Sequence, residues 1–379
     1  MKKIMSAALA LSLALTSVSA VFADTAETAN VASAPSAEPA VYSISLDEAV
    51  QMAYENNAQL EANLLKQKGN EVSRSSAAIT QRTYRNMAVN VSSNFDLYCL
   101  KNGYYVDAAE MGIRISQMEY EKIKADIAYD VTEAYYNLVL MQKLLNAAEN
   151  SYNLALDNKK AVDAQYALGL IPELDYENAN VTVQSCENAL TEYKLNYETA
   201  EQNLKILINK DAENCTVIPT DEIECEEYIS NPDEDIPSAM ETRFDLSSLK
   251  ETLDLAETYF DLSKALTDES ATYNTAYASY MEADYNYTHT QKLIALSIKS
   301  AYNKVLTTKA NMETSKLQYE IELKKYDASK LKYELGMITN LELTSCINDL
   351  YSAQVNYANS KLNYRLAVEK YKYEITIGL

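Results

Sequence analysis

The chain has 379 residues, a formal net charge of −22 and a single histidine. So acidic a chain is a poor partner for nucleic acid or anionic lipid, because both require a basic surface. We interpret the one histidine, His289, as a surface or interface residue. A single histidine cannot form a histidine-rich metal site or a catalytic arrangement that needs several histidines. No glycine-rich phosphate or dinucleotide loop occurs. We therefore expect no enzyme activity, no metal and no cofactor.

The N-terminus is typical of an export signal. Lys2 and Lys3 precede an apolar run from Ile4 to about Val18, and small residues lead to Ala23. We predict a signal peptide at 1–23 and a flexible leader, rich in Ala, Ser, Thr and Pro, at 24–41. No later run approaches the roughly 20 apolar residues of a spanning helix, so the mature protein is expected outside the cytoplasm without a transmembrane α-helix.

Apolar residues occur at every second position near residue 90. Apolar Met87, Val89, Val91, Phe95 and Leu97 alternate with polar or small residues, and Lys101-Asn102-Gly103 follows as a turn. The pattern predicts at most a short β-hairpin near 87–115. A strand of about ten residues is the length that membrane β-barrels use.

Two turns further along share one sequence pattern. Tyr166-Ala-Leu168-Gly169-Leu-Ile171 and Tyr333-Glu-Leu335-Gly336-Met-Ile338 lie 167 residues apart (336 − 169). The same shift aligns the chain without gaps from 127 to 375, which indicates an internal duplication. Upstream, Leu60 aligns with Leu246 at a shift of 186, so the first copy carries 19 extra residues (186 − 167).

The repeats lack helix breakers over long stretches. No Gly or Pro occurs between Gly112 and Gly169, nor between Pro237 and Gly336. Apolar residues recur every 3.5 positions, which predicts a coiled-coil-like seam whose helices need neighbours on both faces. The stretch 273–287 fits a helix face or a strand face, and we favour helix. The seam of the first copy consists of Ile127, Val131, Ala134, Leu138, Met141, Leu145, Ala148, Tyr152 and Ala155, and the second copy places Ile294, Ile298, Ala301, Val305, Met312, Tyr319 and Leu323 in it.

The fold class is therefore mainly α, with two tandem repeats of long antiparallel helices at 42–209 and 241–379. An acidic linker at 210–240 joins them and includes one short strand at Cys215–Ile218. Cys215 and Cys225 flank a short loop of this linker. A disulfide between them and buried free thiols are both open interpretations.

Four motifs, in this order, resemble the TolC family of outer-membrane efflux channels. They are Ser45-Leu-Asp-Glu-Ala-Val50 with Asn56-Asn-Ala-Gln-Leu60, the run Val131-Thr-Glu-Ala-Tyr-Tyr-Asn-Leu138, the duplicated Gly turn, and Arg243-Phe-Asp245-Leu246. The resemblance covers about 42–379. The family inserts strands in both copies to cross the outer membrane, whereas this sequence offers one convincing strand, so a reduced or missing barrel is expected.

The resemblance implies a homotrimer whose helices form a hollow tube in the cell envelope, at the outer membrane or its periplasmic face. The turns Leu168-Gly169-Leu170-Ile171 and Leu335-Gly336-Met337-Ile338 would form its far end and dock a periplasmic adaptor protein. Indirectly, the adaptor connects the tube to an inner-membrane pump.

The resemblance also implies which residues would form a gate at the entrance of the tube. Asp175, Tyr333 and Glu342 match family positions, whereas Ile338 stands in place of a family arginine and Ser345 in place of a carboxylate. From the residues alone, Asp175 and Glu342 are first-turn carboxylates favoured by the helix dipole. A ring of such carboxylates would attract cations.

The function expected is that of a passive duct subunit in a tripartite efflux or secretion system. Two alternatives remain: a non-conducting envelope scaffold that keeps the protein contacts, and a secreted coiled-coil adhesin.

Overall fold

The structure is a computed structural model that describes residues 40–55, 57–210, 214–266 and 270–378. The predicted signal peptide, and the leader up to residue 39, lie outside the described residues. The helices are α1 (Leu46–Tyr54), α2 (Ala58–Tyr84), α3 (Phe95–Lys101), α4 (Tyr104–Ala167), α5 (Glu173–Leu207), α6 (Pro232–Thr242), α7 (Phe244–Ser263), α8 (Ala271–Glu334) and α9 (Asn340–Thr376), and the strands are β1 (Ala40–Ile44) and β2 (Cys215–Pro219).

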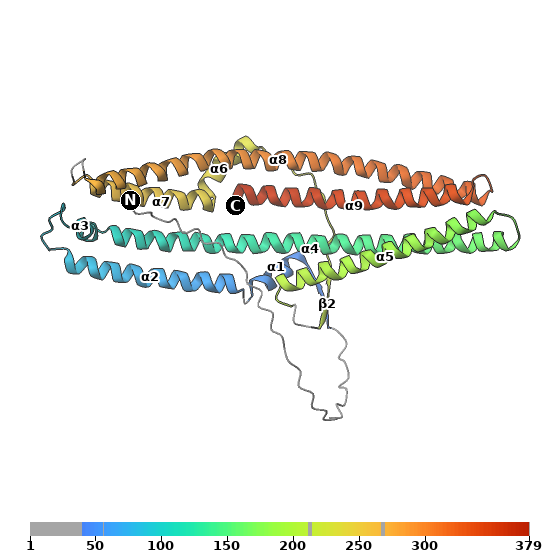
Figure 1. Ribbon diagram of the computed structural model, residues 1–379, viewed down its shortest axis with the longest axis horizontal. Helices are drawn as coiled ribbons and strands as arrows, with labels where there is room; N and C mark the ends of the chain where they lie inside the picture. Colours follow the sequence, from blue (N-terminus) through green and yellow to red (C-terminus); the bar gives the residue numbers. More distant parts are fainter. Residues whose placement is uncertain (1–39, 56, 211–213, 267–269, 379) are drawn as a thin grey trace, which may run out of the picture. The chain divides into compact units, whose positions relative to one another are not determined.

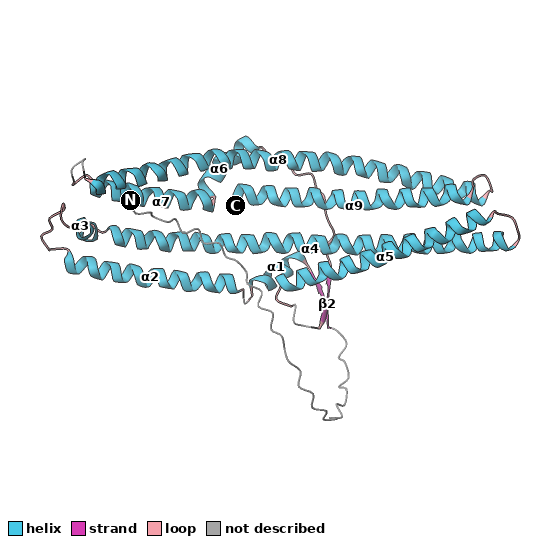
Figure 2. Cartoon of the chain, viewed as in Figure 1, coloured by secondary structure: helices cyan, strands magenta, loops and turns pink. Residues whose placement is uncertain are grey.

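The fold is mainly α, as predicted (Figure 2). Within the unit of residues 40–379, α4 and α8 are the long helices along which the others pack (Figure 1). Helices α2 and α5 follow one another along one side of α4, and α7 and α9 lie between α4 and α8. A helix of 64 residues is about 96 Å long at 1.5 Å per residue. In the described part of the chain, no helix has both the length and the hydropathy that crossing a membrane requires.

The helix bounds repeat at the two shifts found in the sequence. Helices α4 and α8 both have 64 residues and begin at residues 104 and 271, a difference of 167 (271 − 104). Helices α2 and α7 begin at 58 and 244, a difference of 186 (244 − 58). The extra residues of the first copy lengthen α2, which has 27 residues against 20 in α7, and lengthen the connection that contains α3.

The β-hairpin predicted near 87–115 is wrong. Residues 87–94 form turns and irregular backbone, and α3 and the start of α4 occupy the rest. The Asn94 side chain accepts a hydrogen bond from the Leu97 N–H at 3.1 Å and so caps α3. Phe95 then packs edge-on against Tyr259 of α7, with 5.5 Å between the ring centroids, while Cys99 one turn later is fully buried. The 273–287 stretch is helical, as favoured.

A short parallel sheet lies beside the long helices. Strand β2 confirms the strand predicted at Cys215–Ile218, whereas its partner β1 was not predicted. The Tyr135 hydroxyl on α4 donates to the Ile44 carbonyl at 2.9 Å and accepts from the Thr220 and Asp221 N–H groups. This tyrosine therefore anchors the sheet on α4.

A disulfide between Cys215 and Cys225 is not formed, and both are free thiols. Strand pairing carries Cys215 into the core beneath β1, where the sheet holds its backbone in register. Cys225 lies on α9 instead, with its thiol 3.6 Å from the Lys361 carbonyl oxygen. The linker thus directs the two thiols to different partners.

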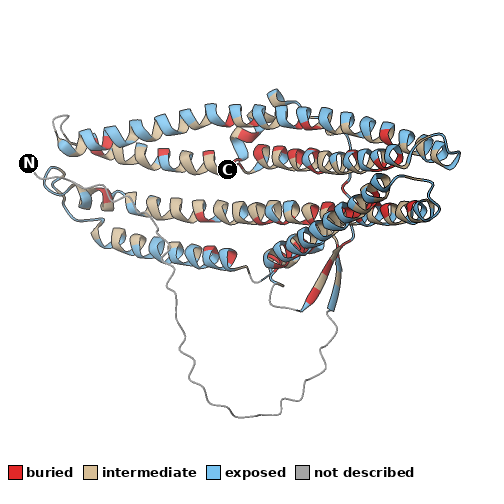
Figure 3. Cartoon of the chain, turned by 45° about the vertical axis from the view of Figure 1, so that its right-hand side comes forward, coloured by how far each residue is buried: buried red, intermediate tan, exposed pale blue. Residues whose placement is uncertain are grey.

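The positions of the predicted seam are buried or half-buried, apart from one. In the first copy, Val131 and Leu138 are fully buried, and in the second copy Ile298 and Val305 are too. Figure 3 shows buried positions recurring along α4 and α9. Leu323 is an exception, because it is exposed while its neighbour Glu322 is buried and hydrogen-bonded to Gln318 at 2.6 Å.

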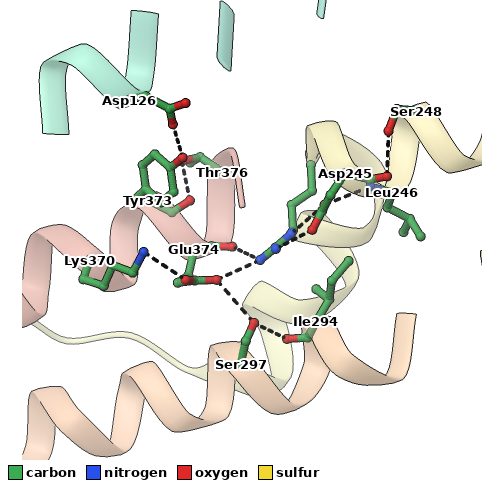
Figure 4. A network of polar contacts seen from close by, with 11 residues as sticks. Asp126, Asp245, Leu246, Ser248, Ile294, Ser297, Lys370, Tyr373, Glu374 and Thr376 are labelled. Atoms are coloured by element: carbon green, nitrogen blue, oxygen red, sulfur yellow. Dashed lines mark hydrogen bonds and ion pairs between the residues drawn. The ribbon is translucent and has the colours of Figure 1, made fainter. Parts of the chain in front are cut away.

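A buried polar network joins the start of α7 to the end of α9 (Figure 4). The Arg243 side chain, 3% exposed, pairs with Asp245 at 2.6 Å and with Glu374 at 3.1 Å, and it donates to the Glu374 carbonyl at 2.7 Å. Glu374 also accepts from Ser297 of α8 at 3.3 Å. Next to it, the Tyr373 hydroxyl donates to the Asp126 carboxylate of α4. The network therefore ties α7, α8, α9 and α4 together.

Candidate functional site: the paired helical tips

The turns predicted from the duplicated sequence are the tips of the two long hairpins, and they lie at the same end of the unit (Figure 1). In each turn the N–H of the glycine bonds the carbonyl three residues earlier, Tyr166 or Tyr333, at 2.9 Å. The next N–H bonds the carbonyl five residues earlier, from Leu170 to Gln165 and from Met337 to Lys332. Both ends are therefore Schellman motifs.

The two glycines are required for backbone conformation alone. Gly169 has φ 71° and Gly336 has φ 69°, the left-handed region that residues with a Cβ atom avoid. A Cβ atom placed on either would meet nothing within 4 Å. Close packing is therefore not what selects glycine at these positions.

The tips expose large apolar side chains. Leu168 is 73% exposed and Met337 69%, and Leu170 and Leu335 are close to these values. Ile171 and Ile338, by contrast, are half-buried. Exposed leucine and methionine at the end of a hairpin are what a protein partner can cover.

The two tips touch at the start of α9. The Asn158 side chain of α4 donates to the Thr344 hydroxyl of α9 at 3.1 Å. A small hollow between α5 and α9 is lined by Asp175 and Ala179 on one side and by Asn340 and Leu341 on the other. The structure therefore brings Asp175 beside the first turn of α9.

Glu342 is held by its own helix. Its carboxylate accepts from the Thr339 N–H at 2.8 Å and from the Thr339 hydroxyl at 3.0 Å, which completes a capping box. These hydrogen bonds, the backbone one first, lower the pKa of Glu342. At the matching position α5 has Pro172, which makes no side-chain cap. The two tips thus share a turn and differ in how the next helix begins.

Tyr333 lies in the last turn of α8. Its hydroxyl oxygen is buried and has no hydrogen-bond partner among the described residues. The matching Tyr166 is stacked on Tyr176 of α5, with centroids 4.6 Å apart and planes at 17°. Lys159 lies over the same Tyr176 ring at 5.4 Å. This pair of rings was not predicted from the sequence, although both residues are aromatic and flank the turn.

No metal centre accompanies the tips. Nowhere in the described ranges do three or more His, Cys, Asp or Glu side chains gather in a way that could hold a metal ion. The docking role of the tips and the gating role of Asp175, Tyr333 and Glu342 remain predictions.

The fold is that of two long antiparallel helical hairpins with exposed apolar tips. The chain is similar in fold to a membrane protein from Pseudomonas aeruginosa, with TM-score 0.73 and 16% identity over 93% of this chain and 97% of that chain. It is similar to the Campylobacter jejuni CmeC outer membrane channel, with TM-score 0.68 and 17% identity over 87% of this chain and 85% of the other. The Vibrio cholerae outer membrane protein VceC gives TM-score 0.69 at 14% identity, covering 87% and 95%.

Comparison of the sequence with known proteins points to the same kind of protein as the comparison of folds. Residues 50–210 match the family model of outer membrane efflux proteins. The chain is 26% identical over 122 residues to Toxin and drug export protein A of Aggregatibacter actinomycetemcomitans, an alignment that covers 32% of this chain and about a quarter (26%) of that protein. The resemblance to the TolC family is thereby confirmed, and this family is one of transport proteins and not of enzymes.

Proposed function

We propose that the chain is one subunit of a homotrimeric helical duct in the cell envelope, which gives a passive route for efflux or secretion. The observation that carries this proposal is a pair of open edges on the helical layer. Helices α2 and α5 have α4 on one side, and α8 packs on α6, α7 and α9. Figure 1 shows α2 and α5 at one margin of the unit and α8 at the other.

Each edge exposes an apolar stripe at helical spacing. On α2, Leu65, Val72 and Ile79 recur every seven residues and are exposed. On α8, exposed apolar side chains share one face of a helix with 3.6 residues per turn. The members of the α8 stripe are Tyr277, Met281, Tyr285, Leu296, Leu306, Leu317, Ile321 and Leu331.

The two edges differ from one another, and each exposes apolar side chains. Copies of the chain are therefore expected to associate head to tail. The α2 edge of one copy would pack on the α8 edge of the next, and a rotation that closes gives a ring. The number of copies, three, follows from the resemblance to the TolC family. A closed ring of layers encloses a lumen, whereas the scaffold alternative would keep the ring without conduction.

The tips supply the contact with a partner. A match to outer membrane efflux proteins supports a place in the envelope, with the apolar tips directed toward a periplasmic adaptor protein and, through it, an inner-membrane pump. Asp175 and Glu342 near the tips would then line the entrance. Export of the chain itself rests on the predicted signal peptide.

Single-channel recording tests the duct. Purified trimer is expected to conduct ions when added to a planar bilayer and to prefer cations, and Asp175→Asn with Glu342→Gln should reduce that preference. Intact trimers that stay silent would contradict the duct and favour the scaffold. A stable monomer in light scattering would contradict both and favour the adhesin.

A further inference from the structure

A cavity of about 350 Å³ lies away from the tips, where α4, α8 and α9 meet the linker between the repeats. Its volume falls in the range of about 300–1,000 Å³ that is usual for sites of small organic molecules. Its lining comes from both repeats and from the linker, so a bound molecule would contact all three.

The floor of the cavity is apolar. Leu140, Leu144 and Ala147 of α4 are at most 3% exposed, and Ile223 of the linker, which is 2% exposed, closes the floor. Placing an apolar ring or chain against such a floor is favourable, because it removes apolar surface from water.

One wall is aromatic. Tyr319 of α8 and Tyr357 of α9 are stacked with centroids 5.9 Å apart and planes at 18°, and both line the cavity. Burial raises the pKa of the Tyr357 hydroxyl. A flat ring can therefore pack along the two aromatic side chains here.

Two lysines, Lys143 and Lys361, line the same cavity in a chain of net charge −22. Lys143 has a partner in Glu222 at 3.3 Å, but the Glu222 side chain is 77% exposed, which makes the pair weak. Lys361 has no ion pair within 4 Å in the described residues. The positive charges of Lys361, Arg365 and Lys143 all act on the nearby Cys225 thiol, whose pKa is raised chiefly by burial. Positive charge therefore converges beside the apolar floor.

We propose that this cavity is a binding site for a small aromatic carboxylate. The ring occupies the space between the α4 floor and the Tyr319–Tyr357 wall, and the carboxylate lies at Lys361 and Lys143. A charge-assisted bond to an ammonium group orients the ligand, and the apolar floor holds it. Because the ligand bridges the repeats and the linker, its binding stabilises their junction, and the stabilisation rises with ligand concentration above the dissociation constant.

Titration calorimetry on the full-length protein tests the site, with 2-naphthoate as the anionic probe and 2-naphthalenemethanol as its neutral counterpart. We expect naphthoate to bind at one site per chain and the alcohol to bind about tenfold more weakly, the loss of one charge-assisted contact. Lys361→Ala should weaken the binding of naphthoate by about the same factor. Lys160→Ala removes an exposed lysine toward the tips and should leave the affinity unchanged. Ala358→Leu, which adds volume to the wall, should also weaken binding.

Three results would overturn the site: no heat of binding at millimolar naphthoate, equal binding of the alcohol, or equal binding by the Lys361→Ala and Lys160→Ala variants. Thermal melting of each variant shows whether it is folded. The outcome is separate from that of the bilayer recordings, because the titration needs no conduction and no residue that lines the cavity belongs to a tip or to either exposed apolar stripe.

Discussion

At the scale of residues, the tip glycines show a constraint of backbone conformation without one of space. Each has a positive φ, and neither has a heavy atom within 4 Å of the position that a Cβ would take. Gly69, in the middle of α2, also has open space around that position but does not have a positive φ. Comparing the three glycines therefore distinguishes a requirement for left-handed backbone from a requirement for space.

We expect Gly169→Ala and Gly336→Ala each to lower the free energy of unfolding by about 1 kcal/mol, the cost of a left-handed residue with a Cβ atom. Gly69→Ala should instead raise it by about 0.5–1 kcal/mol, because glycine inside a helix is unfavourable. Denaturant titration measures all three. A loss of stability on Gly69→Ala equal to that of the tip variants would contradict the assignment.

The capping box of Glu342 makes the second tip sensitive to acid. Its folded-state pKa is lowered by hydrogen bonds from Thr339, so its stabilising effect is present above the ordinary value of 4.5 and is lost as pH falls through the folded pKa. Glu342→Gln should therefore lower the melting temperature at neutral pH, and the difference from wild type should vanish in acid. Asp175→Asn serves as the control, because α5 begins at Pro172 without a side-chain cap. A pH-independent difference for Glu342→Gln would contradict this explanation.

At the scale of elements, Arg243 connects the start of one helix to the end of another. The Arg243 guanidinium reaches the α9 backbone as well as its Glu374 side chain. A Cβ at Gly378, just after α9, would clash with the Arg243 guanidinium. The backbone at the end of α9 thus packs closely against the Arg243 side chain.

Arg243→Ala should cost about 3 kcal/mol in unfolding free energy, because the buried Glu374 loses its ion pair with Arg243 and keeps only the one with Lys370, at 3.3 Å. Arg74→Ala is the control, since it breaks an exposed pair with Glu110 whose loss should cost less than about 1 kcal/mol. Denaturant unfolding of both variants checks the prediction. Equal costs would show that burial of the Arg243 pair has no bearing on stability.

Sequence patterns predicted some elements and misjudged others. The seam was predicted because Val131 and Leu138 recur at coiled-coil spacing, and both are fully buried. The alternation from Met87 to Leu97 was interpreted as a strand. There the packing of Phe95 on Tyr259, from a helix more than 150 residues later, favours helix instead. Strand β1 was missed because its partner lies 175 residues away.

At the scale of the whole molecule, the two open edges predict how copies associate. Val72→Asp with Ile79→Asp puts charge on the α2 stripe, whose side chains face away from α4, so the fold should persist while trimers are lost. Val41→Asp with Ile229→Asp adds the same charge at exposed apolar positions outside the stripe and should leave the trimer intact. Sedimentation velocity measures both. Trimers that survive the α2 substitutions would show that this edge is not the interface.

The sequence by itself determined the duplication, the long helices and the two glycine turns, because periodicity, helix breakers and left-handed backbone are local properties. Tertiary structure alone decided that β1 pairs with β2, that Cys215 and Cys225 have different partners, and that Arg243 is buried against Glu374. It also decided that both tips lie at one end and that a cavity opens beside the linker. Each of these depends on residues far apart in the chain, whose contact no local pattern records.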